Sequence, residues 1–116
     1  MKLMFSFFVS AILLVSAFNV TAGLGDQATT AREVVGEVRV QNTGTGATYY
    51  FVSEDKNWSA SVCPNARYAY VSHADMGAKE IYAAALASRV SGKPISFSGT
   101  CGPSHDQYLK INYTLF

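Results

Sequence analysis

The residue types that most often do chemistry gather in two loops of this 116-residue chain. Ser104, His105 and Asp106 are the three side-chain types of a nucleophilic triad, but they are consecutive in the chain. Such triads assemble from separate segments, because three successive residues cannot point their functional atoms into one relay. We therefore interpret this stretch as a polar loop and predict no catalytic residue.

A second polar group, His73 and Asp75, would have to meet His105 and Asp106 in space to hold a metal ion. Zinc sites use Cys and His ligands at recognised spacings, which this set lacks. The sequence therefore predicts no metal site and no cofactor.

Glu33 and Glu37 are the one close pair of acids along a predicted strand. Four residues of extended chain place them about 13 Å apart, farther than the paired carboxylates of glycoside hydrolysis. We interpret them as a solvated strand face, and we expect the protein not to be an enzyme.

The first 22 residues indicate the cellular compartment of the protein. Lys2 is followed by an apolar run from Leu3 to Phe18, and the small residues Val20 and Ala22 precede a polar stretch. This is typical of a secretory signal peptide cut after Ala22, so residues 1–22 are predicted to be removed and the protein to be secreted or periplasmic. No stable membrane insertion is expected after cleavage, and an uncleaved anchor is the alternative.

Cleavage would leave a neutral chain with one pair of cysteines. Loss of Lys2 leaves eight basic and eight acidic side chains, so nothing predicts binding to nucleic acid or to an anionic membrane. Cys63 and Cys101 are most simply one disulfide in an exported protein, with a stabilising effect of about 4 kcal/mol.

The elements that must position these residues are mostly strands. Alternation of apolar and polar residues, bounded by turn residues, predicts strands in four places and in one of two adjacent candidates. They are 34–40, 48–53, 95–98 and 108–116, with 67–72 favoured over 58–63. In the first strand Val34, Gly36, Val38 and Val40 share the face expected to be buried, and Val35 alone breaks the pattern. Residues 23–31 are interpreted as a lead-in.

Helical spacing replaces this alternation between Met76 and Ser91. Gly92 and Pro94 then end the predicted helix, and Ser72 or Asp75 is expected to cap its start. Its apolar stripe comprises Ala78, Ile81, Tyr82, Ala85, Leu86 and Val90.

Three strands, a helix and two more strands predict a mainly β single domain over residues 23–116. This is the element order of a small five-stranded Greek-key barrel, the oligonucleotide/oligosaccharide-binding fold. An open sheet with the helix on one face is the alternative.

Tyrosine dominates the aromatic residues of the exported part. Its flat apolar ring and hydroxyl group suit surfaces that stack on sugars or pack on another protein. The candidate ligand-binding residues are Trp58, Tyr49 and Tyr68. Trp58 lies in a polar stretch and is the first choice for a contact surface, with a lid over the core as its alternative.

Four segments resemble a known family: Val35–Val40, the Thr43-Gly44 turn, Tyr50-Phe51 and Ser91–Ile95. They are similar to the binding subunit of subtilase cytotoxin and, more broadly, to the pentameric binding subunits of bacterial AB-type toxins. The resemblance implies a five-stranded barrel, a homopentameric ring with helices lining its pore, a cell-surface glycan ligand and a partner toxin chain. The position of a serine with which that family holds sialic acid falls near Val35, which has no hydroxyl group. No family binding residue is therefore carried over.

Together these features predict an exported, disulfide-stabilised binding module like a toxin binding subunit, with a glycan or protein ligand and a ring of copies. The alternative is a monomeric periplasmic structural or envelope-associated protein without a glycan ligand.

Overall fold

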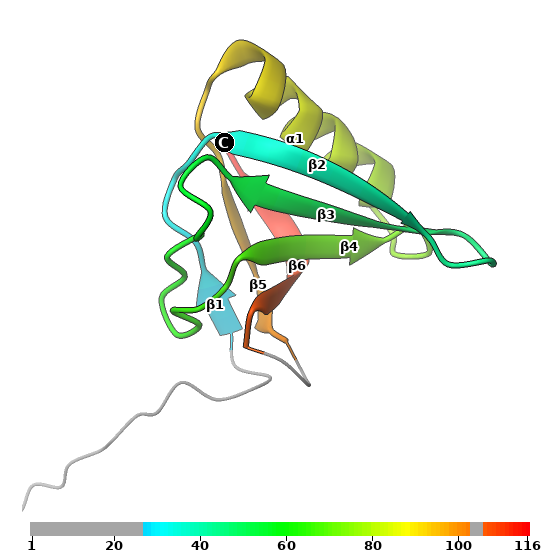
Figure 1. The fold of residues 1–116 in the computed structure, drawn as a ribbon, viewed down its shortest axis with the longest axis horizontal. Coiled ribbons are helices and arrows are strands. Elements are labelled where there is room, and N and C mark those ends of the chain that lie inside the picture. Colours follow the sequence, from blue (N-terminus) through cyan, green and yellow to red (C-terminus); the bar gives the residue numbers. More distant parts are fainter. Residues whose placement is uncertain (1–26, 103–105) are drawn as a thin grey trace, which may run out of the picture.

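The computed structural model describes residues 27–102 and 106–116, which form six strands and one helix (Figure 1). The elements are β1 (Gln27–Thr29), β2 (Val35–Asn42), β3 (Ala47–Ser53), β4 (Tyr68–Ser72), α1 (Ala78–Ser91), β5 (Ser96–Cys101) and β6 (Tyr108–Leu115). The mainly β fold with one helix is therefore confirmed. The predicted signal peptide lies outside the described residues.

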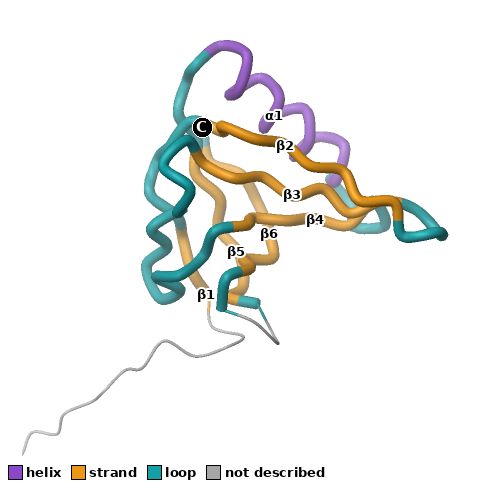
Figure 2. Tube along the Cα trace, in the orientation of Figure 1, coloured by secondary structure: helices purple, strands orange, loops and turns teal. Residues whose placement is uncertain are grey.

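All six strands belong to one sheet with the order β1-β5-β6-β4-β3-β2. Neighbouring strands are antiparallel except β4 and β6, which are parallel. The curled sheet places β5 and β6 across the back of β2, β3 and β4, as the tube in Figure 2 shows. Helix α1 carries the chain from β4 across to β5, and β6 then lies between these two strands in the sheet.

The sheet has six strands and is open, unlike the predicted five-stranded closed barrel. Residues 27–29, interpreted from the sequence as a lead-in, form β1 and pair with β5. The chain then bends, makes an isolated bridge between Glu33 and Ile95, and enters β2 at the other edge. One bent segment thus supplies both edge strands, so β1 and β2 do not pair with each other.

Bulges change which residues of a strand are buried. In β2 the register shifts between Val35 and Glu37, and Val35 is buried while Val40 is 55% exposed. The bulge lets both Val35 and Val38 face the core. The predicted burial of Val40 is wrong, because Val40 lies two residues farther toward the hairpin, where β2 extends past the core. In β6 Leu109 and Ile111 are buried, whereas Tyr113 and Leu115, beyond the register shift, are exposed.

Helix α1 packs against β2, β4 and β6 and closes the core. It ends at Gly92, as predicted, where a positive φ of 73° lets the backbone N–H bond Ser88 O at 2.8 Å. Its start differs from the prediction, because Gly77 occupies the cap position without a side-chain hydrogen bond. The buried stripe includes Ser88 in place of Val90, which is 86% exposed. Ser88 Oγ accepts a bond from Val35 N at 3.1 Å and so ties the helix to β2.

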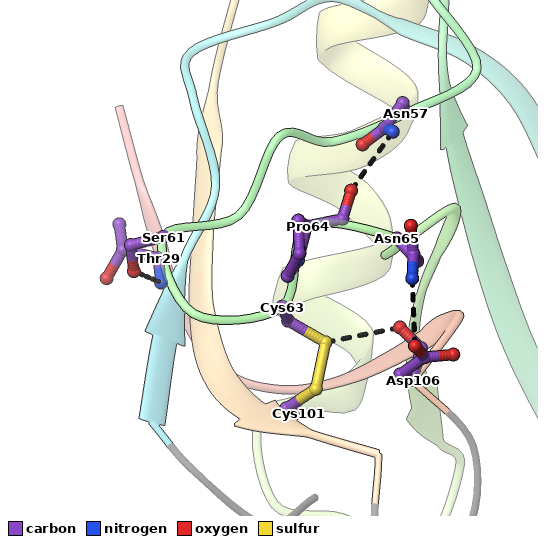
Figure 3. The surroundings of a disulfide bond; sticks show 8 residues. All are labelled: Thr29, Asn57, Ser61, Cys63, Pro64, Asn65, Cys101 and Asp106. Atoms are coloured by element: carbon purple, nitrogen blue, oxygen red, sulfur yellow. Dashed lines mark hydrogen bonds between the residues drawn. A yellow bond between two sulfur atoms is a disulfide. The ribbon is translucent and has the colours of Figure 1, made fainter. Parts of the chain in front are cut away.

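A disulfide joins the loop between β3 and β4 to the end of β5 (Figure 3). Cys63 and Cys101 are bonded with Cα atoms 5.6 Å apart, which confirms the predicted pairing. Asn65 Nδ2 donates to Asp106 Oδ2 at 2.9 Å, and Ser61 Oγ accepts a bond from Thr29 N at 3.1 Å. The loop is therefore held against β1, β5 and the start of β6. Within the described residues, no helix has the length and apolar character needed to cross a lipid bilayer.

Candidate ligand-binding face

Four tyrosines cover the outer face of the sheet, on the side opposite the core. They come from three adjacent strands: Tyr50 from β3, Tyr68 and Tyr70 from β4, and Tyr108 from β6. Alternation along the strands sends their neighbours Phe51, Ala69, Val71 and Leu109 into the core. We call the four half-buried rings the tyrosine face.

The sheet register brings these rings together. Tyr50 lies opposite Tyr70 in the β3–β4 ladder, and Tyr68 lies beside Tyr108 in the β4–β6 ladder. The centroids of Tyr68 and Tyr108 are 5.1 Å apart in a stacked pair, and those of Tyr50 and Tyr70 are 5.9 Å apart. Such offset and tilted contacts hold aromatic side chains in place, so the face is a preformed cluster.

Cationic side chains border the tyrosine face. Arg39 on β2 and Arg67 just before β4 place their guanidinium carbons 5.4 and 5.5 Å from the centroid of Tyr68. Glu37 forms an ion pair with Arg39, and the hydrogen bond from Arg39 lowers the pKa of the Glu37 carboxyl. At the other side, Lys110 Nζ lies 3.6 Å from Asp75 Oδ1.

The hydroxyl groups of Tyr50 and Tyr70 remain neutral at physiological pH. Burial raises the pKa of Tyr50, and the nearby hydroxyls of Tyr108 and Tyr70 raise it further. Burial also raises the pKa of Tyr70, and the negative charge of Asp75 adds to this effect. Neutral hydroxyls both donate and accept hydrogen bonds, as the bond from Tyr50 to Gln41 Oε1 at 2.8 Å illustrates.

A shallow hollow of about 410 Å³ lies between the tyrosine face and β2. Its lining combines aromatic rings with polar and cationic groups: Arg39, Val40, Gln41, Tyr50, Tyr68 and Tyr108. Rings that offer apolar surface beside hydrogen-bonding groups match a ligand that has both apolar faces and hydroxyl or carbonyl groups.

Of the three ligand-binding residues predicted from sequence, only Tyr68 lies on this face. Trp58 is fully buried, and its Nε1 donates to Phe51 O at 2.9 Å, so its prediction as a surface contact is wrong. The loop folds Trp58 inward, where it packs edge-on against Phe97 with centroids 5.1 Å apart. Tyr49 faces the core and packs against Tyr82 of α1, with their ring centroids 4.6 Å apart.

The sequence reasoning missed Tyr50, Tyr70, Tyr108 and Arg39. One local signal could have found two members of the face, because Tyr68 and Tyr70 share parity in a short strand. Tyr50 joins them through the antiparallel pairing of β3 with β4, and Tyr108 through the parallel pairing of β4 with β6. No local pattern reveals either pairing.

The structure describes only some of the polar loop residues considered for catalysis or metal binding. Ser104 and His105 lie outside the described residues. His73 lies at the β2–β3 hairpin, where its Nδ1 accepts a bond from Ala47 N at 3.1 Å. In the described part of the chain, no group of three or more His, Cys, Asp or Glu side chains is arranged to hold a metal ion.

Comparison with known proteins returned no match among family models, curated proteins or solved structures.

Proposed function

We propose that the protein is an exported binding module that holds a glycan on the tyrosine face. The supporting observation is the cluster of four half-buried rings beside a hollow of about 410 Å³. Sugar rings present apolar C–H faces flanked by hydroxyl groups, which match tyrosine rings bordered by Gln41 and Arg39. Export rests on the signal-like first 22 residues and agrees with the disulfide.

We also propose that the fold is related to a small Greek-key barrel. Strands β2 to β6 with the helix between β4 and β5 follow the element order of the Greek-key barrels that bind oligosaccharides and oligonucleotides. In those barrels the face of the second and third strands binds the ligand. Here these are β3 and β4, which carry Tyr50, Tyr68 and Tyr70.

A glycan array probed with the purified protein tests the proposal, using Tyr108→Ala as the variant. We expect one class of glycan to bind and the variant to lose about tenfold in affinity, because a ring contact contributes about 0.5–1.5 kcal/mol beyond its buried area. The matched control is Tyr113→Ala, which removes a ring that is 52% exposed near α1, away from the tyrosine face. Equal losses in both variants, or no glycan bound, would contradict the proposal.

If no glycan bound, the alternative of a monomeric periplasmic structural or envelope-associated protein without a glycan ligand would be favoured. The ring of copies and the partner toxin chain follow from the toxin resemblance alone. Light scattering on the same samples measures the particle mass and so separates the ring from the monomer.

A further inference from the structure

Strand β2 ends the sheet, and one of its sides has no strand beside it in the described part of the chain. At its beginning α1 covers this side: Val35 N bonds Ser88 Oγ, and Arg89 donates to Gly36 O. Beyond the bulge, residues 38–42 extend past this cover, and Val40 there is 55% exposed. An uncovered strand edge is a template for another strand.

The register shows which backbone groups this edge offers. Thr43 N donates to Gly46 O at 3.0 Å across the hairpin, which makes that pair hydrogen-bonded. Because such pairs alternate along an antiparallel ladder, Gln41 and Arg39 direct their N–H and C=O groups toward β3. Val38, Val40 and Asn42 therefore direct theirs outward. His73 N bonding Ala47 O at 2.8 Å agrees, because Ala47 lies opposite Asn42 and bonds away from β2.

The side chains along this edge carry an excess of positive charge. Arg39 forms an ion pair with Glu37, and both Arg39 and Arg67 lower the pKa of that carboxyl, so one carboxylate faces two guanidinium groups. Lys56 also lowers this pKa, but it lines the same hollow as Glu54, whose carboxylate offsets its charge. Arg67 Nε is shielded from solvent and has no hydrogen-bond partner among the described residues. Glu54 and Asp55 follow β3 at the covered end, where Glu54 N bonds Val34 O at 3.0 Å, away from residues 38–42. An incoming acidic group beside Arg39 would thus meet one guanidinium charge more than Glu37 balances.

Charge and the cover provided by α1 together argue against a second copy of the chain as the occupant. Self-pairing centred on Val38 would set Arg39 opposite Glu37, but it would need the edge at Gly36, whose carbonyl already accepts a bond from Arg89. Antiparallel self-pairing centred on Arg39 would set two arginines directly opposite each other. Centring on Val40 would set the two Arg39 side chains on a diagonal about 7–8 Å apart. Like charges so placed across a ladder are destabilising, and each copy would add its own Arg67.

We propose that the free edge of β2 binds an extended acidic peptide segment of a partner protein as an added strand. Backbone bonds to Val38, Val40 and Asn42 hold the peptide, since added strands gain affinity from the main chain and specificity from alternate side chains. The peptide residue opposite Arg39 shares its face of the sheet, so a carboxylate there pairs with the guanidinium. Residues opposite Val38 and Val40 point to the other face and are apolar. The segment therefore reads apolar, acidic, apolar.

Fluorescence anisotropy tests this with two labelled, end-capped probes, Thr-Val-Glu-Val-Glu-Val-Thr and its counterpart with lysine in place of glutamate. We expect the acidic probe to bind about tenfold more tightly than the lysine probe. Val40→Pro removes an outward N–H without cutting a bond to β3, and it should weaken binding about tenfold. Val40→Thr keeps that N–H and the branched side chain, and it should bind like the unchanged protein.

If Val40→Pro does not fold, a second pair of variants tests whether the edge binds an acidic segment. Arg39→Gln should weaken the acidic probe about fivefold, while Arg32→Gln, which removes an exposed arginine that bonds Pro94 O, should not. Equal affinity for both probes, no binding of either, or equal effects of the two arginine changes would overturn the proposal. Sedimentation showing a dimer that Val40→Pro disrupts would overturn it in favour of a second copy. Glycan binding is read separately through Tyr108→Ala, so either proposal can fail alone.

Discussion

Glu33 is a half-buried carboxylate whose surroundings oppose its charge. Its Oε1 atom is shielded from solvent without a hydrogen-bond partner among the described residues. Burial raises the pKa of this carboxyl above 4.5 and Asp55 raises it further, while a hydrogen bond with Ser53 acts in the opposite direction. A raised folded pKa means that the native state binds the proton more tightly than the unfolded state does.

Stability should therefore fall as pH rises from about 4.5 through the raised pKa of Glu33. Glu33→Gln removes this charge, so we expect a higher urea midpoint than that of the unchanged protein at about pH 7 and no gain at about pH 4. Glu54→Gln is the control, because it makes the same substitution at an exposed position of the adjacent turn. A gain of equal size at both pH values would contradict the role given to burial.

At the scale of residues, the sequence predicted the residue type of the binding face better than the location of each residue. The choice of Tyr68 followed from the abundance of tyrosine, and it lies on the tyrosine face. Trp58 was misplaced because its neighbours Asn57 and Ser59 are polar and suggest a surface. Those neighbours are exposed, yet a loop pinned by a disulfide turns the indole between them into the core. That inward turn depends on contacts with β5, which lies far along the chain.

The helix is the element whose prediction can be tested most directly. Ala85 lies at the middle of its buried stripe and is fully buried. Ala85→Asp would bury a carboxylate without a partner, so we expect a loss of several kcal/mol in the free energy of unfolding. Ala83→Asp, on the exposed side of the same helix, should change it by no more than about 0.5 kcal/mol. Similar urea midpoints for the two variants would mean that the stripe does not face the core.

Element boundaries could be predicted from sequence where local chemistry sets them, and strand faces could not where bulges intervene. Gly92 ends α1 because a glycine accepts the left-handed conformation that the helix end needs. By contrast, the shifts at Val35/Glu37 and at Ser98/Gly99 depend on the partner strand. At Gly99 a Cβ atom would lie 1.8 Å from Lys110 O, so the bulge there requires glycine. The free edge of β2 was invisible for the same reason, because it depends on which strand ends the sheet.

The whole molecule depends on a crosslink between two segments that the sheet alone does not join. The loop between β3 and β4 contributes Trp58, Ala60 and Ala66 to the core but contains no strand. The Cys63–Cys101 bond closes a sequence separation of 38 residues and fastens this loop to β5. In a domain of this size, one core gives little reserve of stability.

Reduction should therefore lower the free energy of unfolding by about 4 kcal/mol, the loop-closure value for such a separation. Urea denaturation with and without a phosphine reductant measures this difference, with Trp58 fluorescence as the probe because its indole is fully buried in the native state. The double variant Cys63→Ala, Cys101→Ala should match the reduced protein and show no further response to reductant. If the reduced protein kept the same midpoint and native Trp58 emission, the loop would be held by its core contacts and by the hydrogen bonds at Asn65 and Ser61. The disulfide would then contribute no stability, and its place in the fold would need another explanation.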